Sequence, residues 1–288
     1  MPRIKAVAMT RAAVAPQAFF LEAALGQRFC LFHAPPGGHD ARAGLLYIHP
    51  FAEEMNRSRR LVAEQSRAFV RAGFAVLQMD LYGCGDSAGD FEDATWALWR
   101  DDVMLAHDWL RARITGPLWL WGLRSGCLLA AQLAGQAAAA NLLFWQPVVS
   151  GQQHLKQFLR LGPTADMLRG GAGAGVAELL QQLALGNLVE VAGYRVSPKL
   201  ARGLALATLD DLGAGAHVRC LELSHAPDAA ISPALAAQLL RWQAGGCQAV
   251  ASVIEGPACW QVAASPTCPA LQAASLNAVA HTATGHST

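Results

Sequence analysis

Features that mark several large protein classes are missing from this 288-residue sequence. The formal net charge is only +1 and no stripe of basic residues occurs, so we expect no nucleic-acid partner. Residues 1–20 contain only short, broken apolar runs, which argues against a secretory signal. No apolar run reaches transmembrane length without an interrupting charge, proline or glycine, so we expect no membrane-spanning segment.

The cysteines show no sign of a disulfide framework or a metal site. There are seven of them at irregular spacing, and none forms a C-x-x-C pair. This usage favours a reducing compartment, so we expect a cytoplasmic protein. It signals no structural zinc, and the sequence calls for no other metal or cofactor.

Short apolar runs alternate with helical stretches through the middle of the chain, and 53% of all residues are apolar. The runs 45–49 (LLYIH) and 74–80 (FAVLQMD) are typical of buried strands, whereas 96–113 has apolar residues at helical spacing. Further strands are predicted at 118–122, 141–147, 218–224 and 249–255, further helices at 57–72, 125–135 and 233–244, and an antiparallel edge hairpin at 19–24 and 28–35. The pattern predicts an α/β fold with a mostly parallel central sheet and helices on both faces.

Residues 151–209 break this alternation, because they contain amphipathic pieces and a Gly-rich hinge, 169–175, but no clear strand. A long insertion over the carboxyl ends of a parallel sheet is most often a lid, so we predict a helical lid; an extra packing layer is the alternative. The core then comprises 1–150 and 210–262. Residues 263–288 are rich in alanine, serine and threonine without periodicity, which predicts a weakly ordered C-terminal tail.

The segment PLWLWGLRSGCLLAAQLAG, residues 117–135, predicts a strand, a sharp turn and a helix. Hydrolases with the pattern G-x-S-x-G carry a nucleophilic serine on such a turn, and small residues two before and two after it let strand and helix close. Here the flanks of Arg124 are both glycine, whereas those of Ser125 are leucine and cysteine. Steric fit therefore favours Arg124 at the nucleophile position and Ser125 at the start of the helix.

Four segments resemble the α/β-hydrolase superfamily: the turn at 122–126, DLYGCGDSAGD at 80–90, YIHPF at 47–51 and HAPDAAISP at 225–233. The resemblance implies the α/β-hydrolase fold. It also implies a triad acid at Asp228 and an oxyanion loop at His49 and Phe51, with the backbone amide of Ser125 as a neighbouring donor.

A narrower resemblance rests on four unusual strings: LYIHPFAEEMNRSRR, LQMDLYGCGDSAGDFEDATW, LWLWGLR and GPACWQ. These strings are similar to the family called exosortase A system-associated hydrolase 2. The resemblance implies a gene setting beside the exosortase and exopolysaccharide genes of Gram-negative bacteria. It further implies hydrolysis of an ester, thioester or amide bond, and a link to envelope biogenesis.

The base that such hydrolysis needs is missing from its expected place. The loop that should carry the triad histidine reads GPACWQ, residues 256–261, and no histidine lies between His225 and His281. His225 can act as a base if its loop reaches the elbow; a half-exposed loop residue is the commoner interpretation. Trp260 is expected to fill the space of the missing base.

An arginine at the elbow suggests a different chemistry. The Ser125 and Phe51 amides and a helix N-terminus favour negative charge, so Arg124 would complete a receptor for a carboxylate or phosphate. Alternatively, Arg124 pairs with Asp228 and plugs the pocket, because a buried arginine needs a partner. In either case the triad is degenerate, and the loss of nucleophile and base removes most of its rate enhancement.

Glu53 and Glu54 follow the oxyanion loop, where a carboxylate can bind a substrate hydroxyl or amine. The commoner alternative is a surface ion pair with Arg57, Arg59 or Arg60. Three functions remain open: a hydrolase with a displaced catalytic set, a non-catalytic binder of an anionic or acyl ligand, and a structural partner in an envelope-polymer assembly. A homo-oligomer is compatible with all three.

Overall fold

The computed structural model describes residues 15–35, 41–135, 141–163, 174–209, 212–226, 228–261 and 267–283. Its strands are β1 (Gln17–Ala23), β2 (Gly26–His33), β3 (Gly44–Ile48), β4 (Ala75–Met79), β5 (Leu118–Leu123), β6 (Asn141–Trp145), β7 (Val189–Val191), β8 (Tyr194–Val196), β9 (His217–Ser224) and β10 (Gln248–Glu255). Its helices are α1 (Glu53–Arg71), the short η1 (Phe91–Asp93), α2 (Trp96–Arg111), α3 (Gly126–Ala134), α4 (Gly151–Leu159), α6 (Val176–Ala184), α7 (Pro198–Leu206), α8 (Pro233–Ala244) and α9 (Pro269–Ala283).

Eight strands form one central sheet in the order β1-β2-β4-β3-β5-β6-β9-β10. The hairpin β1–β2 joins this sheet antiparallel to β4. All neighbours from β4 through β10 in this order are parallel. The inner strands are largely apolar because both of their faces are covered; β3 reads GLLYI and every residue in it is buried. The predicted mostly parallel sheet and its edge hairpin are confirmed.

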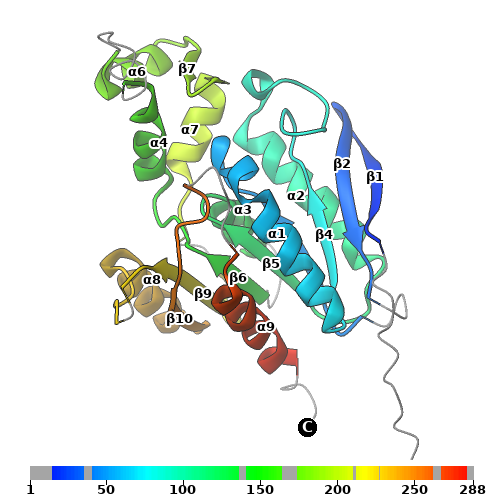
Figure 1. Cartoon of the computed structure of the whole chain (residues 1–288). Helices are drawn as coiled ribbons and strands as arrows, with labels where there is room; N and C mark the ends of the chain where they lie inside the picture. Colours follow the sequence, from blue (N-terminus) through cyan, green and yellow to red (C-terminus); the bar gives the residue numbers. More distant parts are fainter. Residues whose placement is uncertain are drawn as a thin grey trace, which may run out of the picture.

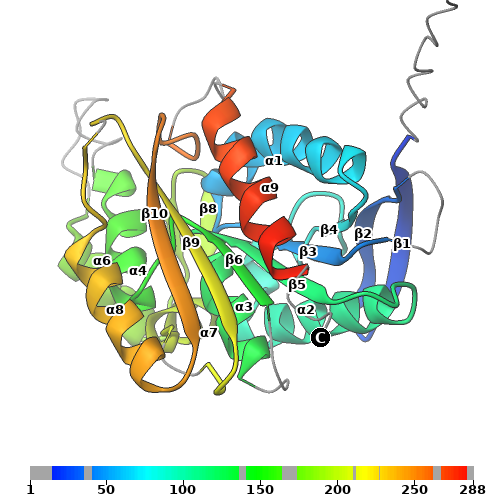
Figure 2. The same cartoon turned by 90° about the horizontal axis from the view of Figure 1, so that it is seen from below.

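Helices cover both faces of this sheet (Figure 2). α1 and α9 pack on one face, where Phe69 and Trp121 belong to one buried apolar cluster. α2, α3 and α8 pack on the other face, where Trp99 and Trp242 belong to a second cluster. None of the helices in the described part of the chain combines the length and apolar character needed to cross a membrane.

The carboxyl ends of the parallel strands meet at one edge of the sheet, and the inserted helices lie beyond that edge (Figure 1). α4, α6, α7 and the β7–β8 hairpin make up the described part of this insertion. Its two ends meet at an antiparallel bridge between Ser150 and Thr208. Beside this bridge, Gly151 N donates a hydrogen bond to Ala207 O at 3.0 Å. Action as a lid stays a prediction, and most of the Gly-rich hinge predicted at 169–175 lies outside the described residues.

The C-terminal segment forms a packed helix, so the prediction of a weakly ordered tail is wrong for its described part. α9 contacts β6, β9, β10 and α1. Leu271 is only 1% exposed, and Ser275 Oγ accepts a hydrogen bond from Trp145 Nε1 at 2.9 Å. The helix is alanine-rich, with small residues on every side, so it lacks the apolar stripe by which an amphipathic helix is recognised.

We expect Leu271→Ala to destabilise the protein by about 2–4 kcal/mol, because it opens a cavity between α9 and the sheet. Urea unfolding of the purified variant measures this loss. Leu240→Ala on α8 is the matched control, because Leu240 is 68% exposed and its truncation should change stability by no more than about 0.5 kcal/mol. Equal stability of the two variants would contradict the packed position of α9.

Candidate functional site

The turn between β5 and α3 has the geometry of a nucleophile elbow, and Arg124 lies at its tip. Arg124 has a φ of 54°, a left-handed conformation that non-glycine residues seldom adopt. A Cβ on Gly122 would lie 2.7 Å from the backbone nitrogen of Cys127, and one on Gly126 would collide with the carbonyl oxygen of Ile48. Only glycine therefore fits on either side of Arg124, and strand and helix close tightly around it.

The hydroxyl of Ser125 is occupied by an internal hydrogen bond. Phe51 N donates to Ser125 Oγ at 2.9 Å, and Ser125 is only 3% exposed. This bond ties the loop after β3 to the first residues of α3. The Phe51 amide, which the sequence suggested as a donor to a bound anion, is thus already paired within the chain.

The guanidinium of Arg124 pairs with Glu54, so the expected pair with Asp228 is not the one that forms. Arg124 Nε lies 3.2 Å from Glu54 Oε1, and the two side chains are only 14% and 12% exposed. Asp228 is exposed in the loop after β9. The pairing arises because α1 begins at Glu53, directly after the loop that follows β3, so its first turn brings Glu54 to the elbow. Of the two alternatives for Glu54, a ligand contact or a surface ion pair with Arg57, Arg59 or Arg60, the surface pair is not the one that forms.

Two acid–base groups lie beside Arg124, and burial sets their protonation. Burial raises the pKa of Glu54 to about 7, although the charge of Arg124 acts against this rise. Burial lowers the pKa of His154, on α4, to about 3, and Arg124 lowers it further. His154 Nε2 lies 4.0 Å from Glu54 Oε2. At neutral pH His154 is therefore uncharged, and Glu54 can gain or lose a proton.

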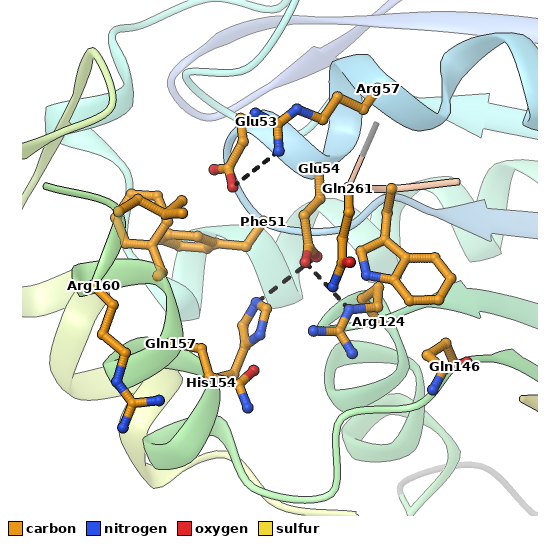
Figure 3. Close-up of a pocket in the computed structure, with 13 residues that line it drawn as sticks. Phe51, Glu53, Glu54, Arg57, Arg124, Gln146, His154, Gln157, Arg160 and Gln261 are labelled. Carbon is orange, nitrogen blue, oxygen red and sulfur yellow. Dashed lines mark hydrogen bonds and ion pairs between the residues drawn. The ribbon is translucent and has the colours of Figure 1, made fainter. Parts of the chain in front are cut away.

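These groups line a cavity of about 580 Å³. Figure 3 shows Glu54, Arg124 and His154 converging there from α1, the elbow and α4. Gln146, just after β6, adds a carboxamide to the wall, and its Oε1 accepts a hydrogen bond from Leu223 N at 2.7 Å. The apolar part of the wall consists of Phe51, Phe158, Leu161 and Trp260.

The other predicted site residues divide between the cavity and the loops. Glu53 lines the cavity and pairs with Arg57 at 3.8 Å. Trp260 also lines it, and its ring centroid lies 5.3 Å from Arg124 Cζ, a cation–π contact. His225 is exposed and does not line the cavity.

His49 orders the loop rather than facing the cavity. Its side chain is buried, and Leu81 N donates to Nε2 at 3.2 Å. Its Nδ1 lies 2.8 Å from the carbonyl oxygen of Pro50, so Nδ1 carries the proton. These two bonds join the loop after β3 to the loop after β4 and fix the backbone that leads into α1.

The sequence did not reveal the contribution of α4. His154, Gln157 and Phe158 of α4 line the cavity, as does Leu161 just beyond the end of this helix. The spacing of three and four residues within α4 places the first three on one helical face, which is the signal that could have identified them. The sequence alone does not indicate that this face turns toward the elbow, because the contact joins the insertion to the core.

The cysteines near this edge are unsuited to nucleophilic chemistry. Burial raises the pKa of the Cys84 and Cys127 thiols, so both stay protonated at neutral pH. Within the described ranges, no three His, Cys, Asp or Glu side chains are grouped so that they could hold a metal ion.

We expect Arg124→Ala to lower the free energy of unfolding by about 2–3 kcal/mol at pH 8, because it leaves the Glu54 carboxylate buried without its partner. The loss should shrink as the pH falls. The pKa of folded Glu54 lies above its ordinary value of 4.5, so stability falls as the pH rises from about 4.5 to about 7. Removal of Arg124 steepens this fall, because its charge holds that pKa down.

Denaturant unfolding of wild type and variant at pH 6 and pH 8 measures this difference. Arg60→Ala is the matched control, since Arg60 forms an exposed ion pair with Glu64 at 3.0 Å and its loss should cost less than about 1 kcal/mol. A loss for Arg124→Ala that is larger at pH 6 than at pH 8 would show that the Glu54 pair is not the interaction removed.

Comparison with known proteins agrees with the architecture. The X-Pro dipeptidyl-peptidase (S15 family) model matches residues 35–151, which is less than half of the chain. A search of curated proteins gives no significant match. Many solved structures match this chain. The three described next have low sequence identity to it.

Est1E from Butyrivibrio proteoclasticus, solved with ferulic acid, covers 91% of this chain and 100% of its own, with 16% identity and a TM-score of 0.65. XC6422 from Xanthomonas campestris, described as an α/β serine hydrolase without a lid, covers 93% and 94%, with 15% identity and a TM-score of 0.59. A thermostable carboxyl esterase from Bacillus coagulans covers 84% and 91%, with 13% identity and a TM-score of 0.56. Identities this low establish the fold and nothing finer: the chain has the α/β-hydrolase fold.

Proposed function

We propose that this protein binds a carboxylate or a similar anion in the elbow cavity without hydrolysing an ester, thioester or amide bond. One observation carries the proposal. The elbow presents the guanidinium of Arg124 where a hydrolase presents a nucleophile. The neighbouring Ser125 hydroxyl accepts a hydrogen bond from the Phe51 amide. A cation thus lies at the point of the fold at which acyl chemistry would need a nucleophile.

The surrounding groups support a degenerate triad. Acyl transfer by serine needs a base within hydrogen-bond reach and an acid that orients this base. Ser125 does not line the cavity, and the loop 256–261 places Trp260 rather than a histidine against Arg124. Asp228 is exposed. The Phe51 amide, bonded to Ser125, is also unavailable to stabilise an oxyanion unless that bond breaks.

The charge of the cavity supports an anionic ligand. Three arginines and two glutamates line it, namely Arg57, Arg124, Arg160, Glu53 and Glu54. The hydrogen bond between Arg124 and Glu54 uses Nε, and Nη1 and Nη2 donate to no described residue. These two nitrogens form part of the planar fork that binds carboxylates in pairs of hydrogen bonds.

A second candidate function is hydrolysis by a displaced catalytic set. The pKa of Glu54 near 7 suits a general base that activates water, and Arg124 could then stabilise the developing oxyanion. The ion pair between these two groups speaks against this function, because Arg124 occupies one oxygen of the would-be base. Glu54 is therefore better suited to hold Arg124 and a ligand than to abstract a proton.

The wider setting of the proposal rests on the sequence resemblance. The strings similar to exosortase A system-associated hydrolase 2 include GLR at the elbow and GPACWQ beside it, both of which supply residues to the cavity. The ligand would then belong to exopolysaccharide or envelope biogenesis. The α4 segment of the insertion would cover it as a lid.

We expect a fluorophosphonate probe to leave the protein unlabelled, because the buried Ser125 hydroxyl lacks a base and already accepts a hydrogen bond from the Phe51 amide. Intact-protein mass spectrometry after incubation with the probe measures this. Est1E or another active serine esterase is the positive control. Labelling of wild type that disappears in Ser125→Ala would show that Ser125 is a working nucleophile and that the chain is a hydrolase.

We expect hexanoate, a simple carboxylate, to raise the melting temperature of wild type in a concentration-dependent way. Saturation at one hundred times the dissociation constant stabilises a protein by about 2.7 kcal/mol. Arg124→Gln should abolish the shift, whereas Arg60→Gln, outside the cavity, should keep it. A shift that persists in Arg124→Gln would locate carboxylate binding elsewhere.

A further inference from the structure

Five buried polar atoms of residues that line the cavity lack a hydrogen-bond partner among the described residues. They are Glu53 Oε2, Trp260 Nε1, Glu54 Oε2 and the two ring nitrogens of His154, and those of Glu54 and His154 lie next to each other. Glu54 is 9% exposed and His154 is 4% exposed, so bulk water does not readily satisfy them. Buried polar atoms are nearly always hydrogen-bonded, and leaving one unpaired costs free energy. Since both residues line the cavity, a bound ligand is a natural source of the missing partner.

The geometry of these atoms selects the partner. Glu54 Oε2 and His154 Nε2 lie 4.0 Å apart and face each other (Figure 3). A single oxygen can lie about 2.8 Å from both, which is an ordinary hydrogen-bond length. A hydroxyl group donates one hydrogen bond and accepts others, so it can donate to Glu54 and accept from His154 at once. A methylene group at this point would do neither, and a carboxylate could accept from His154 but could not donate to Glu54.

The rest of the wall favours a ligand with several hydroxyl groups over a fatty acyl chain. Nine of the thirteen lining residues are polar or charged, so the wall offers many hydrogen-bonding groups. Carboxamides come from Gln146, Gln157 and Gln261, each of which both donates and accepts. A long apolar chain would desolvate these groups without pairing them, which is unfavourable.

We propose that the ligand is a small polyhydroxylated carboxylate, with its carboxylate on Arg124 and a hydroxyl group between Glu54 and His154. This inference rests on the proposed anion binding at Arg124 and adds the chemistry of the neighbouring group. It assigns Glu54 two contacts: Oε1 pairs with Arg124, and Oε2 accepts a hydrogen bond from the hydroxyl group of the ligand. Because His154 lies on α4, the insertion also contacts the ligand in this proposal.

Three probes of six carbons each separate the two parts of the proposal. Gluconate carries a carboxylate and hydroxyl groups, hexanoate carries the carboxylate alone, and sorbitol carries hydroxyl groups alone. Isothermal titration of the full chain should give a dissociation constant about tenfold lower for gluconate than for hexanoate, since one charge-assisted hydrogen bond contributes about that factor. Sorbitol should bind too weakly to measure.

Variants then locate the hydroxyl contact. Glu54→Gln and His154→Phe should each lower the preference for gluconate over hexanoate at least threefold, while Arg124→Gln should abolish binding of both acids. Glu64→Gln, on the outer part of α1, should keep the preference. Circular dichroism confirms that each variant is folded, and the wild-type comparison decides the matter even if one variant fails to fold.

The outcomes distinguish the two proposals. Hexanoate binding equal to that of gluconate, with dependence on Arg124, would overturn the hydroxyl site and leave anion binding intact. A gluconate preference that survives both Glu54→Gln and His154→Phe would also overturn the hydroxyl site. Failure of both acids to bind wild type would overturn the anion-binding function itself.

Discussion

The ion pair between Arg124 and Glu54 is the interaction on which the whole site depends. The elbow forces Arg124 into a left-handed backbone conformation and aims its charge into a partly buried space. Such a charge is tolerable only beside a carboxylate. The first turn of α1 supplies that carboxylate, and the order of the preceding loop, held by His49, determines where α1 begins.

The elbow combines a backbone and a set of side chains that can be considered separately. The glycines around Arg124 keep the close approach of strand and helix that a nucleophile elbow requires. The side chains on this backbone are a cation at the elbow, with a carboxylate and an uncharged histidine beside it. Under the proposed function, the same scaffold carries a site for recognition, in line with the rule that function lies in the side chains rather than in the fold.

Much of the fold could be predicted from the sequence, because periodicity and strand composition are local signals. The steric argument for Arg124 at the elbow was local too, since it needed only the two flanking glycines. The partner of Arg124 could not be predicted, because the sequence suggested Asp228 or a bound anion and did not show that the first turn of α1 brings Glu54 to the elbow. His154 was missed for the same reason, and α9 because its small residues hide any apolar stripe.

The bridge between Ser150 and Thr208 has a consequence for how this protein can diversify. Since the chain leaves and re-enters the core at one point, the intervening segment is topologically a side branch. Its length can change at little entropic cost, because the closure entropy of a loop grows only slowly with length. Related chains can therefore exchange this branch, and with it the part of the cavity wall that α4 provides, while the sheet and the elbow stay as they are.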